Sequence, residues 1–224
     1  MTVPARQFFD RPVVDVARDL LGAALARSTV DGAVTLRITE VEAYDGTNDP
    51  GSHAFRGPSR RNETMFGEPG RFYVYRHLGL HYCANVVCGP AGTASAVLLR
   101  AGEVTGSGPE GLALARTRRL ASGVARTDRD LARGPARLAV ALGLDLSDDG
   151  ADVTDPAGAV VLEVPEAPSG TVLSGPRVGV SGDGGRADLY PWRFWLDGEP
   201  TVSVYRPATK RPAKRPATQR PART

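Results

Sequence analysis

Hydrophobic residues recur at helical spacing in three segments of the chain. These segments are residues 13–21, 109–119 and 134–142, and a period of about 3.6 residues is typical of a helix with one buried side. In the third segment, Pro135 suits a first helical turn and Gly143 suits a C-terminal cap. The pattern therefore predicts three helices, and we expect them to pack against a sheet.

Alternating hydrophobic and polar residues predict the strands. The longest alternating segment is 34–44, and alternate side chains of a strand point to one face. If no bulge interrupts this strand, one face carries Leu36, Ile38, Glu40, Glu42 and Tyr44. Two carboxylates then end an otherwise apolar row. Further strands are predicted at 71–75, 80–87, 94–100, 177–180, 192–196 and 201–205, and the first two are joined as a hairpin at Leu78 and Gly79.

Two segments show neither the helical period nor the alternation of a strand. Residues 45–70 are rich in Gly, Pro, Asn, Asp and Ser, which predicts a long irregular loop, and such loops in compact domains are usually functional. Residues 151–169 are acidic and rich in proline, so we expect a peripheral insertion there. The order of helices and strands predicts one α+β domain over residues 1–205.

Charge is distributed unevenly along the 224 residues. Seven of the 28 Lys and Arg residues lie in 206–224, which repeats Arg-Pro-Ala four times and holds no acidic residue. Residues 1–205 therefore carry 21 basic and 25 acidic side chains. The composition of 206–224 cannot bury a core and predicts a disordered basic tail. Such a tail could follow DNA phosphates or serve solubility alone.

Composition also excludes several classes of protein. The chain has no run of about 18 apolar residues, and residues 1–12 lack the apolar segment of a secretory signal. We therefore expect a cytoplasmic protein that does not contact membranes. Cys83 and Cys88 are the only cysteines, which is too few for a disulfide framework or a four-cysteine zinc site.

A carboxylate at the end of an apolar strand, beside a polar loop, is a candidate for catalysis. Glu40 and Glu42 both fit this description, and their spacing does not separate them. Tyr44, His53 and the tyrosines and histidines of 73–82 could form a stacking pocket for a flat ring. They could equally pack as ordinary strand aromatics.

Histidine spacing argues against a metal site. His77 and His81 are four residues apart, but their segment is predicted to be a hairpin rather than a helix, and no H-E-x-x-H pattern occurs. We predict no metal and no cofactor. Residues 1–205 contain no lysine, so no lysine amine is present there to form a Schiff base.

Arginines accompany these residues in two groups. Those at 56–76, which include Arg76, lie around the loop and hairpin and could bind phosphates. Those at 116–133 alternate with Asp128 and Asp130, so a solvated surface of ion pairs fits that group at least as well.

Several separate motifs together resemble one family. The segment TEVEAYDGTNDPGSHAFRGPSRRNETMFGEPGRFYVY is followed by GLHYCANVV, VLLRA, RGPARLAVALGL and PRVGV. In this order and spacing they are similar to the alkyladenine (3-methyladenine) DNA glycosylases, from about Asp19 to Val204 without the acidic insertion. The resemblance implies a single α+β domain with a curved, mainly antiparallel sheet, surrounding helices and a protruding β-hairpin that inserts into DNA.

The resemblance also implies roles for individual residues. Glu42 would activate the water, and Arg100 and the backbone carbonyl of Val178 would help to hold it. The residues expected to hold or select the flipped base are Tyr44, His53, Tyr75 and Asn85. At the hairpin tip, Leu78 stands where well-known members carry a tyrosine wedge, and we expect it to contact DNA with Arg76 and His77.

The implied activity is base-excision repair by a monomer acting on double-stranded DNA. A damaged purine would be flipped out and its N-glycosidic bond hydrolysed. The implied substrates are 3-methyladenine and 7-methylguanine, with ethenoadenine and hypoxanthine as further candidates. Two other hypotheses remain: a non-catalytic protein that binds damaged DNA, and a metal-dependent hydrolase using Glu42, His53 and His81.

Overall fold

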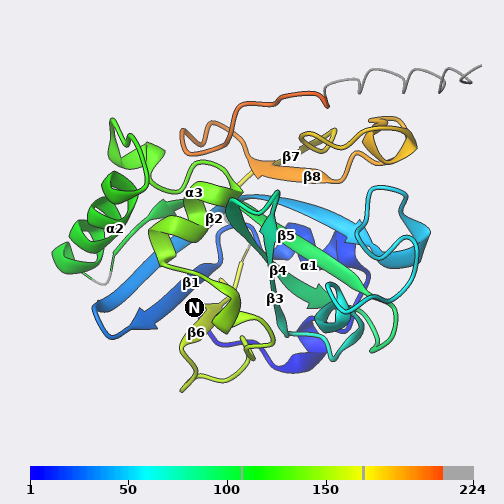
Figure 1. Cartoon of the computed structure of the whole chain (residues 1–224), viewed down its shortest axis with the longest axis horizontal. Helices are drawn as coiled ribbons and strands as arrows, with labels where there is room; N and C mark the ends of the chain where they lie inside the picture. Colours follow the sequence, from blue (N-terminus) through cyan, green and yellow to red (C-terminus); the bar gives the residue numbers. More distant parts are fainter. Residues whose placement is uncertain (107, 168–169, 209–224) are drawn as a thin grey trace, which may run out of the picture.

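The protein forms an α+β fold built on one open antiparallel sheet (Figure 1). The computed structural model describes residues 1–106, 108–167 and 170–208. The α-helices are α1 (Val13–Asp19), α2 (Pro109–Ala121) and α3 (Pro135–Leu142). The strands are β1 (Ala24–Thr29), β2 (Gly32–Asp45), β3 (Phe72–His77), β4 (His81–Cys88), β5 (Ser95–Val104), β6 (Val160–Glu163), β7 (Val172–Gly175) and β8 (Arg193–Leu196).

The three helices confirm the prediction from helical spacing. Helix α3 begins with Pro135 and ends at Gly143, whose φ of 73° suits a residue without a side chain. Its buried face includes Leu138 and Leu142, which join the main hydrophobic core. In the part of the chain that the structure describes, no helix has the length and apolar character needed to cross a membrane.

The strands follow the order β3-β4-β5-β2-β1-β6, and β8 joins β2 while also pairing with β7. Strand β2 is the centre of this arrangement because residues 32–37 pair with β1 and residues 40–42 pair with β8. Strand β5 pairs with β2 from Leu36 to Asp45. The end of β2 therefore lies where several strands and the long loop meet, which is the position of the site described below.

A β-bulge corrects the predicted face of β2. The pairing of β2 with β5 shifts register between Ile38 and Glu40 and again between Glu40 and Val41. Ile38 belongs to the hydrophobic core before the bulge, but Val41 and Ala43 belong to it afterwards. A bulge places an extra residue in one strand and so interrupts the alternation of faces. The shared face of Leu36, Ile38, Glu40 and Glu42 was expected only for a strand without a bulge, and β2 does not meet that condition.

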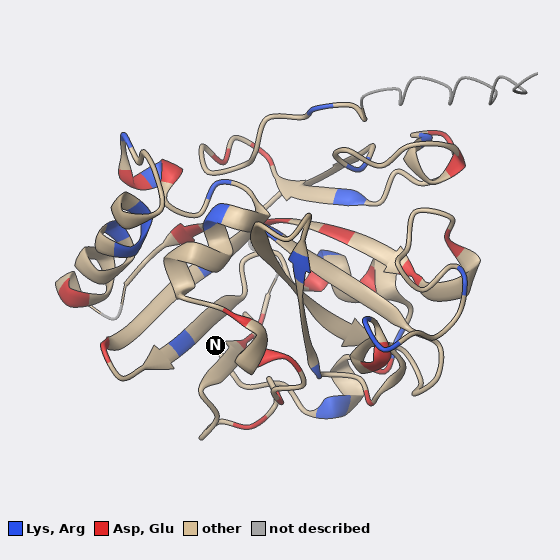
Figure 2. Ribbon diagram, viewed as in Figure 1, with Lys and Arg blue, Asp and Glu red and all other residues tan. Residues whose placement is uncertain are grey.

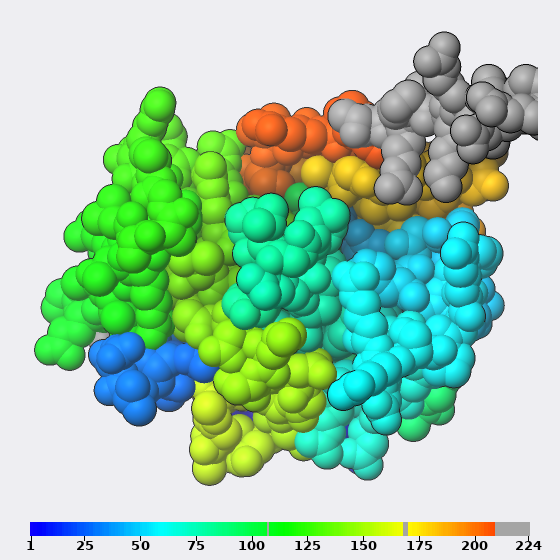
Figure 3. Space-filling model, in the orientation of Figure 1, coloured from blue at the N-terminus to red at the C-terminus, as the bar shows by residue number. Residues whose placement is uncertain are grey.

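The β3–β4 hairpin has the predicted turn. Leu78 and Gly79 both have positive φ, 50° and 69°, and the Leu80 N–H donates to the His77 carbonyl over 3.0 Å. Positive φ at both central residues is typical of a two-residue type I′ turn. Leucine rarely adopts this conformation, yet Leu78 does so with 80% of its surface exposed. The hairpin is the green-blue surface near the centre of Figure 3.

Other local predictions were wrong or incomplete. Residues 177–180 form a turn rather than a strand, because Gly179 has a φ of 72°. Residues 201–205 contain no strand. The acidic segment 151–169, which was predicted as a peripheral insertion, provides the edge strand β6 and buries Val153 in the core. Within the predicted tail, residues 209–224 lie outside the described part of the chain.

Candidate active site

A cavity of about 470 Å³ opens beside the end of β2. This volume is within the range of about 300–1,000 Å³ typical of small-molecule pockets. Its walls come from six places: β2, the loop after β2, the β3–β4 hairpin, β5, the start of α3 and the turn at 178–181. The lining residues with polar or aromatic side chains are Glu42, Tyr44, Ser52, His53, Tyr73, Tyr75, His77, Asn85, Arg100 and Ser181.

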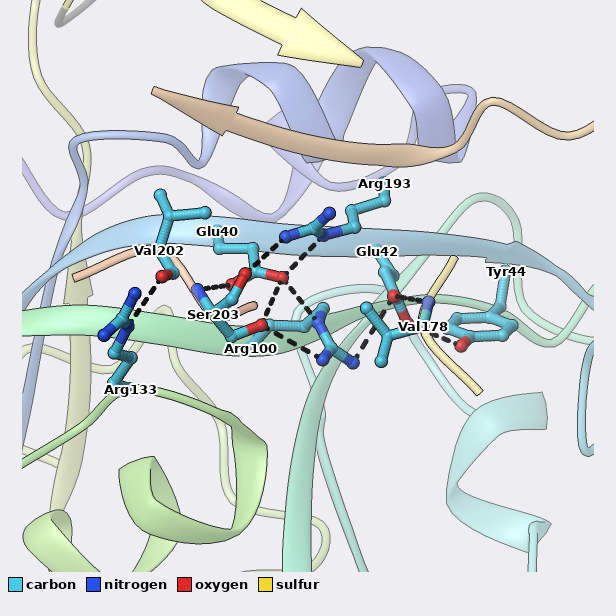
Figure 4. A network of polar contacts seen from close by, with 9 residues as sticks. All are labelled: Glu40, Glu42, Tyr44, Arg100, Arg133, Val178, Arg193, Val202 and Ser203. Atoms are coloured by element: carbon cyan, nitrogen blue, oxygen red, sulfur yellow. Dashed lines mark hydrogen bonds and ion pairs between the residues drawn. The ribbon is translucent and has the colours of Figure 1, made fainter. Parts of the chain in front are cut away.

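Glu42 is the carboxylate of this cavity, and its side chain is fully buried. The Tyr44 hydroxyl donates to its Oε2 over 2.8 Å, and the Val178 backbone N–H donates to its Oε1 over 2.6 Å. The Arg100 Nη1 lies 3.3 Å from Oε1 (Figure 4). A carboxylate accepts about four hydrogen bonds, so these three donors leave one acceptor position without a partner among the described residues.

Glu40 has a different environment, although it is only two residues away and equally buried. It does not line the cavity, and four donors occupy it. Arg100 Nε and Arg193 Nε donate to its Oε1 over 2.8 and 2.7 Å, and the Ser203 N–H and hydroxyl donate over 2.6 and 2.9 Å. Burial alone would raise the pKa of Glu40, but Arg100 and Arg193 outweigh it and hold this pKa below its ordinary value. Glu40 is a structural anion.

Arg100 connects the two carboxylates. Its Nε donates to Glu40, its Nη1 faces Glu42 and its Nη2 donates to the Ser203 hydroxyl over 3.3 Å (Figure 4). Burial alone would lower its pKa, but the charges of Glu42 and Glu40 raise it. Arg100 is therefore a permanent cation at the wall of the cavity.

Aromatic rings form the opposite wall. The His53 ring meets the Tyr75 ring edge to face at 4.6 Å between centroids, and Tyr73 stacks on Tyr75 at 5.4 Å. His53 keeps a large exposed surface, but partial burial and the neighbouring charges of Arg61 and His77 lower its pKa to about 4. Because even its ordinary pKa of 6.5 lies below 7, the imidazole is neutral at pH 7.

Asn85 forms part of the cavity wall beside this aromatic cluster. Its side-chain Nδ2 donates to the backbone carbonyl of Tyr73, its partner across the β3–β4 hairpin, over 3.0 Å. This bond fixes the amide, which is 5% exposed. A rigid polar group at this place can accept or exclude a ring according to the substituents on the ring's edge.

The structure brings the predicted site residues together. Glu42, Tyr44, His53, Tyr75, Asn85, Arg100 and Val178 all line the cavity. Val178 contacts Glu42 through its N–H, while the role expected of its carbonyl, to hold the water, stays a prediction. Tyr73 was predicted only as one of the aromatic residues of 73–82 that could form a stacking pocket, and Arg177 was not predicted. Tyr73 lines the cavity with a buried hydroxyl that has no hydrogen-bond partner among the described residues, and Arg177 lies over the Tyr44 ring.

The residues predicted to contact DNA lie on the hairpin. Arg76 and His77 are exposed on β3, and His77 also lines the cavity. The second arginine group has acidic partners: Arg116 forms an ion pair with Asp128 at 2.7 Å. Figure 2 shows basic and acidic positions close together at α2 and the loop that follows it.

The residues of the metal hypothesis are not brought together. His81 is absent from the cavity lining, which contains Glu42 and His53. Within residues 1–106, 108–167 and 170–208, no group of three or more His, Cys, Asp or Glu side chains is arranged to hold a metal ion.

Comparison with known proteins gives matches over most of the chain. The family described as Methylpurine-DNA glycosylase (MPG) matches residues 7–200. A protein of Streptomyces avermitilis, provisionally named 3-methyladenine DNA glycosylase, is 57% identical over 208 residues, which cover 92% of this chain and 93% of the relative. Proteins with the same name are 57% identical in Leifsonia xyli subsp. xyli, covering 91% and 92%, and 44% identical in Mycobacterium tuberculosis, covering 90% and 93%.

Proposed function

The chain belongs to the methylpurine-DNA glycosylase family, and we propose that this base-excision-repair glycosylase removes 3-methyladenine and 7-methylguanine from double-stranded DNA. The observation that carries the proposal is the environment of Glu42. A buried carboxylate with three donors and one free acceptor position stands at the wall of a cavity lined with aromatic rings. This arrangement suits the attack of water on a sugar whose flat base is held in the cavity.

Glu42 is the general base in this mechanism. It accepts a proton from water, and the water oxygen forms a bond to the anomeric carbon of the sugar. The bond between that carbon and the purine nitrogen breaks, and its electron pair leaves with the base. A purine methylated at a ring nitrogen carries a positive charge, so this electron pair neutralises it on departure. Arg100 and the Val178 N–H hold the carboxylate in position.

The aromatic wall is proposed to bind the flipped base. Tyr44, His53 and Tyr75 offer π faces or edges to a flat ring, and a cationic purine gains further attraction from electron-rich rings. Neutral His53 adds no opposing charge. Asn85 is proposed to select among purines by the groups at their edges. Ethenoadenine and hypoxanthine are neutral and leave less readily, so their removal would be slower.

The hairpin is proposed to open the duplex. Leu78 is exposed and held in a conformation that leucine rarely adopts, and such local strain is often found where function needs it. Apolar side chains act as wedges between base steps in DNA-bending proteins. Leu78 would fill the gap left by the flipped nucleotide, while Arg76 and His77 would contact the backbone. We further propose that the enzyme acts as a monomer.

A base-release assay tests this function. Duplexes containing 3-methyladenine, 7-methylguanine, ethenoadenine or hypoxanthine are incubated with the wild-type protein and with Glu42→Gln, each with and without chelator. We expect the wild type to release the two methylated bases regardless of chelator. We expect Glu42→Gln to lose release by a factor of at least about 10² while it still binds a duplex with an abasic-site mimic. Near-normal release by Glu42→Gln would refute the assignment of the base.

A further inference from the structure

Arg177 is the largest of the fully buried side chains in the described chain, and it lies outside the cavity. Its Nη1 donates to Asp49 Oδ2 over 2.5 Å and to the Ala43 carbonyl over 2.9 Å. Its Nη2 donates to Asp49 Oδ1 over 2.7 Å and to the Gly184 carbonyl over 2.6 Å. The guanidinium is thus held by a bidentate carboxylate and two backbone carbonyls.

The ion pair of Asp49 and Arg177 lies next to two groups that hold Glu42. The Arg177 Cζ is 4.5 Å from the centroid of the Tyr44 ring, and Tyr44 donates to Glu42. The residue after Arg177 is Val178, whose N–H also donates to Glu42. Tyr44 lines the cavity, whereas Arg177 contacts the face of the Tyr44 ring and is absent from the cavity lining. The pair therefore fixes both donors and the ring.

Close packing leaves the guanidinium little freedom to move. A Cβ added at Gly51 would lie only 2.5 Å from the Arg177 Nη2 and 2.9 Å from Val180. Real Cβ atoms essentially never approach a heavy atom that closely, so an alanine at position 51 would force a shift at Arg177, at Val180 or in its own backbone. This provides a way to disturb the packing around the guanidinium without changing the charge of the pair.

The charge of Arg177 matters to any cation bound on the other side of Tyr44. A cation binds an aromatic ring through its π electrons, and a second cation behind the ring draws on the same electrons and repels the first. Burial would lower the pKa of Arg177, but Asp49 and Tyr44 raise it, so the guanidinium stays charged. The side chain of Asp49 is fully buried beside it, and its bidentate contact cancels that charge.

We propose that Asp49 and Arg177 form a charge-balanced positioning pair that fixes Tyr44 and makes its cavity face selective for a cationic purine. The proposal rests on the proposed function, because it requires a purine in the cavity. Asp49 acts through Arg177, and Arg177 acts through Tyr44. Neither residue needs to touch the base.

The test measures affinity rather than base release. In a Glu42→Gln parent, binding is measured to duplexes with cationic 7-methylguanine or neutral ethenoadenine, each relative to the undamaged duplex. Asp49→Asn leaves the guanidinium uncompensated, so we expect it to weaken 7-methylguanine binding about tenfold more than ethenoadenine binding. Arg177→Gln leaves an unpaired anion instead, so we expect the preference to shift toward 7-methylguanine. The second variant also serves if Asp49→Asn does not fold.

Two further variants separate charge from position. Gly51→Ala crowds Arg177 and Val180 but keeps the charges, and Gly51 itself lines the cavity, so we expect binding to both lesions to weaken by the same factor. Asp148→Asn disrupts a buried ion pair with Arg27 elsewhere, 3.2 Å between Arg27 Nε and Asp148 Oδ1, and should leave the preference unchanged. Equal weakening of both lesions by Asp49→Asn, or an unchanged preference in Arg177→Gln, would overturn the proposal. A parent that binds neither lesion above undamaged DNA would instead refute the proposed function.

Discussion

Two buried carboxylates, two residues apart, differ through their partners. Glu40 accepts four hydrogen bonds from Arg100, Arg193 and Ser203, whereas Glu42 keeps an acceptor position toward the cavity. A catalytic base needs such a free position and a structural anion does not. At the scale of the residue, the number of donors around each carboxylate therefore assigns its role more clearly than burial does.

Glu40→Gln should lower the free energy of unfolding of the protein. Removing one partner of a buried ion pair leaves an uncompensated charge and costs about 3–5 kcal/mol. We expect urea denaturation at pH 7 to show a loss of this size in the free energy of unfolding. Glu103→Gln is the matched control: Glu103 is half exposed in its ion pair with Arg37, so the loss should stay below about 1 kcal/mol.

The loss of stability caused by Glu40→Gln should depend on pH. The pKa of Glu40 in the folded protein lies below its ordinary value of 4.5, so the unfolded chain binds its proton more readily. The stabilisation is therefore complete above about pH 4.5 and is lost as the pH falls through the folded pKa. The difference between wild type and Glu40→Gln should shrink as denaturation is repeated toward pH 3. A difference that stays constant would contradict this assignment.

At the scale of elements, the sequence pattern predicted those helices and turns whose formation depends on residues close together in the sequence. Helices α2 and α3 and the β3–β4 hairpin depend on nearby residues, such as Pro135, Gly143 and Gly79. The bulge in β2 depends on its partner β5, and no residue within β2 signals it. The short strand β6 forms because β1 offers an edge.

The candidate site was also predicted only in part from the sequence. The resemblance to a family located Glu42 and the residues around the cavity, while spacing alone could not separate Glu42 from Glu40. The contact between Asp49 and Arg177 joins residues 128 positions apart. Pairing at that distance depends on the folded chain, so neither residue stood out in the sequence.

A substitution at Leu78 in the β3–β4 turn can separate an effect on stability from an effect on base release. Asparagine accepts positive φ more readily than leucine, so Leu78→Asn should keep or slightly raise the thermal midpoint. If Leu78 is the wedge, release of 7-methylguanine from a duplex should fall about tenfold, while release from single strands stays close to wild type. Val30→Asn is the control, since Val30 is fully exposed in the β1–β2 turn and should affect neither. Unchanged duplex release would remove Leu78 from the mechanism.

At the scale of the whole molecule, the net positive charge comes from residues 206–224. Residues 1–205 carry more acidic than basic side chains, whereas the net charge of all 224 residues is +3. Attraction to DNA phosphates is independent of sequence and decreases with salt. We therefore propose that residues 206–224 supply affinity for DNA in general, while the cavity supplies selectivity for damaged bases.

Removal of residues 209–224 tests this division of roles. The truncation keeps Arg206, whose carbonyl accepts a hydrogen bond from the Gly179 N–H over 3.0 Å, next to Val178 of the site. It removes six basic residues, and each lost phosphate contact lowers the slope of log affinity against log salt by about 0.9. We expect weaker binding at low salt, a slope reduced by up to about 5, and an unchanged single-turnover rate at saturating enzyme. A matched chain with these six residues replaced by Gln separates charge from length: it should behave like the truncation, and wild-type salt dependence in either protein would show that this segment does not contact DNA.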